Sequence, residues 1–99
     1  DWHQVLALYD QLLAVAPTPV VALNRAVALA EVRGPAAALA AVDTLDGLER
    51  FHLLHVVRAD LLRRLGRGTE AAAAYDAALA RTPNESERAF LRARRAARG

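Results

Sequence analysis

The sequence contains no cysteine, no lysine and no long apolar segment. Without cysteine the chain forms no disulfide, no thiolate metal site and no thiol nucleophile. No apolar run approaches the ~18 residues that cross a bilayer, and no signal peptide opens the sequence. Its five glycines occur singly, so no glycine-rich loop is present to hold a phosphate. We therefore expect a cytoplasmic protein that makes no contact with a membrane.

The chain has 99 residues, and all thirteen of its basic residues are arginine. That length corresponds to a single domain, and its apolar and charged contents are ordinary for a globular protein. The formal net charge of +2 is small, so the basic composition alone does not indicate nucleic-acid binding. Because the first residue is Asp1 and not methionine, we expect the domain to be excised from a longer chain.

Apolar residues recur at helical spacing along nearly the whole sequence, and no segment alternates like a strand. Asp1 and Asn84, each followed three residues later by Gln or Glu, predict helix starts with a capping box. Thr18 followed by Pro19 predicts a third start. The sequence thus predicts an all-α fold of about six helices over residues 1–17, 19–34, 35–46, 48–65, 69–81 and 84–97.

An internal repeat of about 33 residues underlies this pattern. Val5, Ala38 and Ala71 are spaced by 33, and so are Tyr9, Val42 and Tyr75. Paired helices at this period are typical of tetratricopeptide (TPR) repeats, which stack into a right-handed superhelix of antiparallel helix pairs. We expect a single TPR-like domain over residues 1–99, with an unpaired helix (1–17), two repeats (18–50 and 51–83) and a capping helix (84–97).

The segment GRGTEAAAAYDAALARTP, residues 66–83, matches the second helix of a TPR repeat. Ala59, Ala71 and Ala78 are predicted to let two helix backbones approach closely, and Tyr75 to fill the space between successive helix pairs. The middle repeat departs from this pattern, with Leu45 in place of alanine and Arg50 in place of proline. These departures predict a less regular junction between the third and fourth helices.

Residues with possible catalytic or metal-binding chemistry are few. His52 and His55 lie three apart on one predicted helix, but no third ligand shares their face, and zinc needs three or four. Ser86 has no His and Asp arranged around it, so we interpret it as a residue in the first turn of a helix. We therefore expect no enzymatic activity, no metal site and no cofactor.

The predicted binding surface is the concave face, which the first helix of each TPR pair lines. It begins apolar and ends charged, which suits an amphipathic helix or an apolar peptide with an acidic flank. The chain lacks the Lys/Asn set with which some TPR domains hold a C-terminal carboxylate. Alternatively, other parts of a longer chain cover the apolar portion. The principal groove residues are Val20, Leu23, Asn24, Val27, Val56, Asp60, Arg63 and Arg64.

A candidate basic patch follows on the last predicted helix. Arg88, Arg92 and Arg95 share one face, with Arg94 and Arg98 beside them. No aromatic residues are interleaved for base stacking, so direct DNA contact is not expected. A solvated capping face is the simplest interpretation, and contact with an acidic protein surface is the alternative.

Three motifs, ALNRAVA, HLLH..RADLLRRLGR and NE.ERAFL, belong to longer segments that cover nearly the whole chain. These segments resemble the C-terminal extension of a group of bacterial extracytoplasmic-function (ECF) sigma factors. The resemblance implies a protein-interaction domain that regulates or supports transcription initiation through its own N-terminal sigma regions or RNA polymerase. The chain contains neither sigma region. The alternative is a TPR adaptor that binds a peptide or helix of an unrelated partner.

Overall fold

The computed structural model describes residues 1–97, and within them every regular element is an α-helix. The chain divides into two compact units, Asp1–Leu48 and a second unit that begins at Glu49. The helices are α1 (Trp2–Val15), α2 (Pro19–Arg33) and α3 (Pro35–Val42) in the first unit, and α4 (His52–Arg64), α5 (Gly68–Arg81) and α6 (Glu85–Ala96) in the second. The all-α prediction is confirmed.

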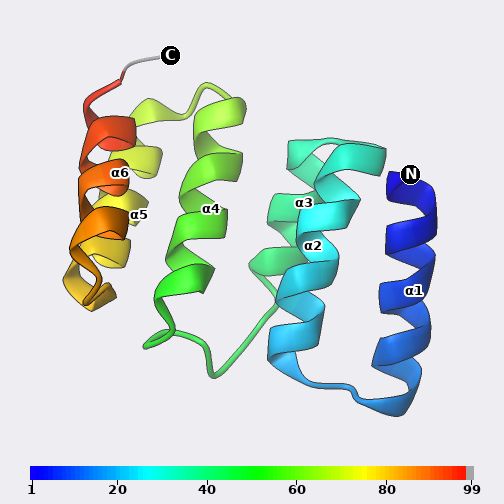
Figure 1. Cartoon of the computed structure of the whole chain (residues 1–99). Helices are drawn as coiled ribbons and strands as arrows, with labels where there is room; N and C mark the ends of the chain where they lie inside the picture. The colour runs from blue at the N-terminus through cyan, green and yellow to red at the C-terminus, as the bar shows by residue number, and fades with distance from the viewer. Residues whose placement is uncertain (98–99) are drawn as a thin grey trace. The chain divides into compact units, whose positions relative to one another are not determined.

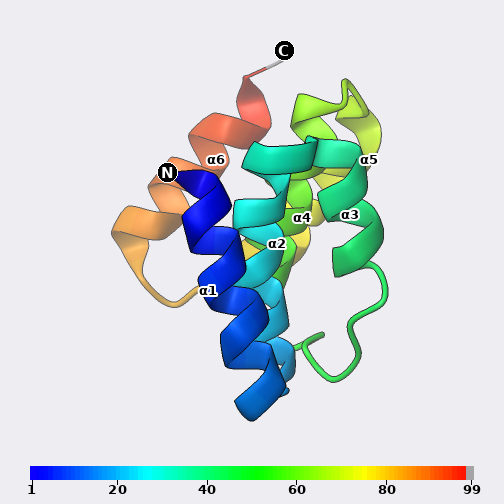
Figure 2. The same cartoon turned by 90° about the vertical axis from the view of Figure 1, so that its right-hand side faces the viewer.

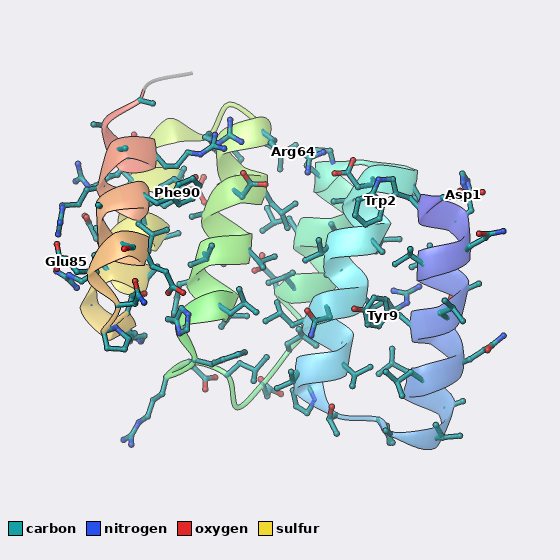
Figure 3. All side chains as sticks on the ribbon, in the orientation of Figure 1. Asp1, Trp2, Tyr9, Arg64, Glu85 and Phe90 are labelled. Carbon is teal, nitrogen blue, oxygen red and sulfur yellow. The ribbon has the colours of Figure 1, made fainter. Side chains whose placement is uncertain are left out.

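Each unit is a set of three helices in which neighbours along the chain pack side by side and run antiparallel (Figures 1 and 2). In the first unit α2 packs against both α1 and α3, and Tyr9 extends from α1 toward α2 (Figure 3). In the second unit α5 packs against both α4 and α6. A superhelix of the kind predicted from the TPR pattern would require a specific arrangement of the two units, so the superhelix stays a prediction.

The starts of the helices follow the 33-residue period. Helices α1, α3 and α5 begin at Trp2, Pro35 and Gly68, each 33 residues after the one before. The same interval separates the starts of α2, α4 and α6 at residues 19, 52 and 85. The repeat therefore sets where the helices begin throughout the described chain.

Three predicted N-caps are confirmed by their hydrogen bonds. An Asp1 carboxylate oxygen accepts from the His3 amide at 3.0 Å, and the Thr18 hydroxyl accepts from the Val21 amide at 3.2 Å. The Asn84 side-chain oxygen accepts from the Glu87 amide at 3.0 Å. Each bond satisfies one of the amides that a helix start leaves without a partner.

The predicted bounds of the third and fourth helices are wrong. Helix α3 ends at Val42, four residues earlier than expected, and α4 begins at His52 instead of Leu48. The Thr44 hydroxyl and amide both donate to the Ala41 carbonyl, at 2.7 and 3.2 Å, which turns the chain out of the helix. Residues 43–51 therefore form an irregular connection, as the departures from the TPR pattern in this repeat predicted.

The turn between α4 and α5 is tight and has a specific cause. Gly66 adopts φ +73°, a left-handed conformation that glycine reaches without the steric penalty of a Cβ atom. The Arg67 amide donates to the Leu62 carbonyl at 2.9 Å, and the Gly66 amide to the Arg63 carbonyl at 3.0 Å. These two bonds form a Schellman motif, which ends α4 at Arg64 and lets α5 begin at Gly68, two residues after Gly66.

The core of the second unit confirms the packing interpretation of the alanine-rich segment. Ala59 on α4 and Ala78 on α5 are fully buried, and Ala71 and Tyr75 are only 4% and 3% exposed. Side chains this small let the backbones of α4 and α5 approach closely.

We predict that Ala59→Leu lowers the free energy of unfolding by about 1–3 kcal/mol, because the added volume is forced into this close helix contact. The matched control is Ala80→Leu on the exposed side of α5, which should change stability by less than about 0.5 kcal/mol. Chemical denaturation of both variants measures the difference. Equal stability of the two variants would show that Ala59 is not at a tight contact.

Candidate functional site

The first half of the predicted groove lies on α2. Val20 and Val27 are 43% and 40% exposed, which leaves apolar surface available to a partner. Asn24 donates from its side-chain nitrogen to the Val20 carbonyl at 3.1 Å. Leu23 is fully buried and belongs to the core, so it offers no surface to a partner.

The second half of the predicted groove lies on α4, where an acidic residue is shared by two arginines. Asp60 accepts a hydrogen bond from Arg63 at 2.7 Å and lies 3.9 Å from Arg64. Hydrogen bonding to Asp60 is the main reason that the pKa of Arg63 is raised, and the Tyr75 side chain adds to the shift, while burial opposes it. Val56 is partly exposed on the same helix. Because the two halves belong to separate units, their joining into one groove stays a prediction.

The predicted basic patch is held by intramolecular bonds. Arg92 pairs with Glu85 at 2.6 Å, and Arg95 makes two hydrogen bonds to Asp76 on α5 at 2.6 and 3.1 Å. Arg88 donates to the backbone carbonyls of Leu79 and Thr82. Arg88 and Arg95 therefore attach α6 to α5, whereas Arg92 is paired within α6, so the three do not form a free cationic face. Arg98, which was predicted to lie beside them, falls outside the described residues.

The role of Arg88 is structural. Its guanidinium reaches the carbonyls at the end of α5, which have no partner within the helix. The buried Thr82 hydroxyl bonds the Ala78 carbonyl at 2.7 Å in the same place. Arginine at a helix C-terminus also interacts favourably with the helix dipole.

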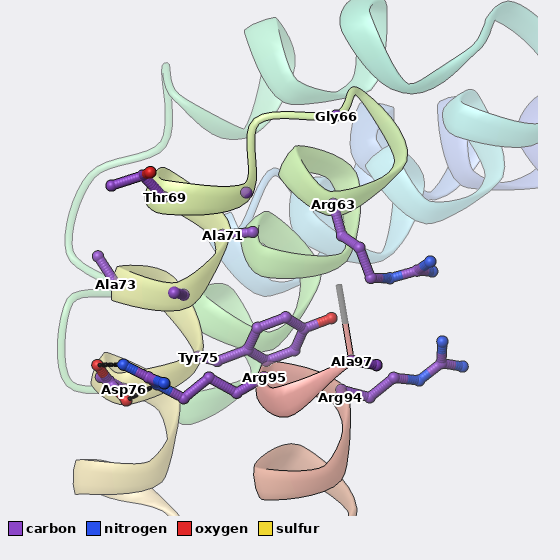
Figure 4. A pocket seen from close by; sticks show the side chains of 12 residues that line it. Arg63, Gly66, Thr69, Ala71, Ala73, Tyr75, Asp76, Arg94, Arg95 and Ala97 are labelled. Carbon is purple, nitrogen blue, oxygen red and sulfur yellow. Dashed lines mark hydrogen bonds and ion pairs between the residues drawn. The ribbon is translucent and has the colours of Figure 1, made fainter. Parts of the chain in front are cut away.

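A cleft that the sequence analysis did not identify lies in the second unit, where the C-terminal ends of α4 and α6 meet the N-terminal part of α5 (Figure 4). Its volume is about 640 Å³. Gly66, Gly68 and several alanines form its walls, and the Tyr75 side chain lies at its centre in Figure 4. Its charged residues are Arg63, Arg94, Arg95 and Asp76. We call it the arginine cleft.

The three arginines of the cleft differ in how far their charges are compensated. Arg95 is paired with Asp76, which raises the pKa of Arg95 through hydrogen bonding first and charge attraction second. Arg63 is paired with Asp60, although its Nε–H is buried without an acceptor in the described chain. Arg94 lies over the Phe90 ring at 5.2 Å and has no carboxylate partner within residues 1–97.

The first turn of α5 beside the cleft carries an ion pair. Arg67 makes two hydrogen bonds to Glu70 at 2.8 and 2.7 Å, and these lower the pKa of the Glu70 carboxyl. Glu70 also lies where a negative charge is stabilised by the helix dipole. It is not among the residues that line the cleft.

A smaller hollow of about 210 Å³ lies between α4 and α6. Leu53, Val56, Phe90 and Leu91 make most of it apolar, and His52 and Glu87 face each other at its edge at 3.6 Å. Phe90 extends from α6 toward α4 in Figure 3 and is 55% exposed. The hollow therefore offers apolar surface next to a charged pair.

The two histidines of α4 have different partners. His52 faces Glu87, whereas the Nε2 atom of His55 lies 2.8 Å from the Glu49 carbonyl. Among the described residues, no three His, Cys, Asp or Glu side chains are grouped as metal ligands. In residues 1–97 we also find no helix with the length and apolarity that a membrane crossing requires.

A comparison with known proteins identifies a longer relative of this chain. The chain is 45% identical over 93 residues to a protein of Rhizobium meliloti (strain 1021) that is described only as uncharacterized. The alignment covers 93% of this chain but 22% of that protein, so the chain spans about a fifth of the length of its relative. No family model and no solved structure matches the chain.

The bonds of Arg88 yield a stability prediction. We expect Arg88→Ala to lower the free energy of unfolding by about 1–2 kcal/mol, because two carbonyls at the end of α5 lose a charged donor. Arg92→Ala is the matched control on the same helix, and it should cost less than about 0.5 kcal/mol because its bond to exposed Glu85 is a surface ion pair. Thermal and urea unfolding measure both. A larger loss of stability in Arg92→Ala than in Arg88→Ala would contradict the structural role of Arg88.

The Glu70 pair yields a prediction about pH. Because the pKa of Glu70 is lowered in the folded state, the pair stabilises the fold above the unfolded-state pKa of a glutamate and loses this effect as pH falls through the lowered value. We expect an NMR titration of the Glu70 carboxyl to give a midpoint below the ordinary value of a glutamate, and Arg67→Ala to raise it. An unchanged midpoint in Arg67→Ala would exclude Arg67 as the cause of the lowered pKa of Glu70.

Proposed function

We propose that this chain is a protein-interaction domain of a bacterial ECF sigma factor. It supports or regulates promoter-specific transcription initiation by contacting the N-terminal sigma regions of its own chain, the core RNA polymerase, or both. The observation that carries the assignment is the resemblance of three motifs, ALNRAVA, HLLH..RADLLRRLGR and NE.ERAFL, to the C-terminal extension of these factors. A longer relative at 45% identity is compatible with a domain that functions as part of a larger protein.

The structure supports the protein-binding part of the proposal in both units. In the first unit, α2 leaves Val20 and Val27 well exposed. In the second, the end of α4 presents Arg63 and Arg64 next to a cleft that contains two more arginines. Apolar side chains beside arginine are the composition that protein interfaces favour.

Direct contact with DNA is not part of the proposal. The arginines of the predicted basic patch already bond carbonyls and carboxylates of the same unit. Arg88 could not turn to a phosphate without leaving the carbonyls at the end of α5 without their donor. A cytoplasmic location follows from the proposed role with RNA polymerase.

The alternative function is a TPR adaptor that binds a peptide or helix of an unrelated partner. The repeated helix starts and the exposed valines of α2 suit such an adaptor equally well. The sequence of the longer protein decides between the two, because sigma regions upstream of this domain favour the first and any other domain favours the second.

The test is promoter-specific transcription in vitro by the full-length protein. We predict that Arg63→Glu with Arg64→Glu reduces transcription roughly tenfold, because reversed charges repel an acidic partner surface. The loss should lessen as salt is raised, since screening weakens interactions between exposed charges.

The control is a second double reversal, Arg33→Glu with Arg50→Glu, which changes the net charge equally at exposed positions outside the proposed surface. Melting curves establish that each variant folds, and Arg63→Gln serves if the reversal at the partly buried Arg63 unfolds the unit. Full activity of the folded Arg63 and Arg64 variant would reject this surface. Full activity after deletion of the domain would reject the proposed function itself.

A further inference from the structure

The arginine cleft has a surplus of positive charge at a defined place. Its lining contains three arginines and one aspartate, and Asp60 outside the lining compensates a second arginine. The guanidinium of Arg94 is left as the charge without a carboxylate partner in the described chain. In Figure 4, Arg63 and Arg94 extend to the same side, toward which the Tyr75 hydroxyl also points, while Arg95 turns away onto Asp76.

We propose that the arginine cleft binds the side-chain carboxylate of an aspartate or glutamate from a protein partner. This inference rests on the protein-binding part of the proposed function and does not depend on the sigma-factor context. Arg94 would supply the principal charge-assisted bonds, and Arg63 would assist from the opposite wall. Guanidinium groups suit this ligand because their donors form a planar fork that matches a carboxylate.

The charge balance favours a single carboxylate over a phosphate group. Arg95 is paired with Asp76, and Arg63 with Asp60, which Arg64 outside the lining also approaches. Arg94 is therefore the one guanidinium of the cleft without a carboxylate partner in the described chain. A carboxylate carries one negative charge, whereas a phosphate monoester carries close to two at neutral pH. The first turn of α5, where a phosphate would be held by backbone amides, already has the Glu70 carboxylate nearby.

The walls of the cleft favour a peptide over a free small acid. Ala72, Ala73 and the two glycines carry no polar side-chain atoms, so the apolar stem and neighbours of an acidic residue find contacts there. The volume of about 640 Å³ lies within the ~300–1,000 Å³ of typical binding pockets, which is room for one or two side chains.

The experiment is an NMR titration of the ¹⁵N-labelled 99-residue chain with two blocked peptides, acetyl-AALEELAA-amide and its matched glutamine version, acetyl-AALQQLAA-amide. We expect the acidic peptide to shift the Nε–H signals of Arg63 and Arg94 and the amides of Ala71 and Ala72 in a saturable way. The glutamine peptide should leave them unchanged. Equal shifts with both peptides, or none with either, would overturn the proposal.

Three variants of α6 test whether Arg94 binds the carboxylate. Arg94→Ala should weaken binding of the acidic peptide about tenfold, the loss expected for a charged hydrogen-bonding partner. Arg94→Lys should give an intermediate loss because it keeps the charge but not the fork. Arg92→Ala, two residues away and outside the cleft, should bind like the wild type. Equal affinities of the Arg94→Ala and Arg92→Ala variants would remove Arg94 from the site.

A parallel titration with inorganic phosphate at matched ionic strength tests the choice of ligand. Phosphate that shifts the same signals with higher affinity than the acidic peptide would replace our assignment with a phosphate site. The outcome is independent of the transcription assay. A sigma factor could fail to need this domain while the cleft still binds carboxylates, and Arg94→Ala could lose peptide binding without any loss of transcription.

Discussion

The close contact between α4 and α5 is the interaction on which the second unit depends. Ala59 and Ala78 are completely buried, so the two backbones approach closely and the ring of Tyr75 fills the remaining space. The Schellman turn at Gly66 then ends α4 at Arg64 and lets α5 begin at Gly68. Because α6 returns antiparallel along α5, its C-terminal end reaches the same level as this turn (Figure 1). The arginine cleft thus arises where the ends of three helices meet, and Tyr75 is both a packing residue and part of the cleft.

Arginine has three different roles in this unit, and the surroundings of each side chain decide which. Arg88 reaches backbone carbonyls that end α5 and therefore acts as a cap. Arg95 is paired with a carboxylate on the neighbouring helix and fixes α6 to α5. Arg94 has neither kind of partner in the described chain and rests on an aromatic ring. Arginines of one helix therefore differ in their availability to a ligand, and of these three only Arg94 is proposed to bind one.

The sequence predicts the helices well where local signals act and poorly where distant contacts decide. Proline, glycine or a capping side chain stands at the starts of α1, α2, α3, α5 and α6, so the 33-residue period could be found from spacing alone. None stands at the start of α4, which was predicted at the wrong residue. The end of α3 could not be predicted from spacing, because the Thr44 hydroxyl bonds the Ala41 carbonyl, which a longer helix would use for its own backbone bond. The helical spacing of apolar residues on α2 did not show that Leu23 is buried whereas Val20 is exposed. The cleft was missed for a related reason, since Asp76 and Arg95 are 19 residues apart and meet only after α5 and α6 have packed.

The position of α6 in the repeat shows how a helix can keep the period and still differ in its packing. Ala26 on α2, Ala59 on α4 and Arg92 on α6 occupy equivalent places, because the three helices begin 33 residues apart. The two alanines are at most 1% exposed, whereas the Arg92 side chain is 49% exposed and paired with Glu85. A long charged side chain at this place prevents another helix from approaching as closely as α5 approaches α4, because its charge and its volume would both have to be buried. Any segment that packs on this part of α6 in a longer protein must therefore do so through a wider and more polar contact. That is the kind of surface with which a terminal repeat faces solvent or a partner domain.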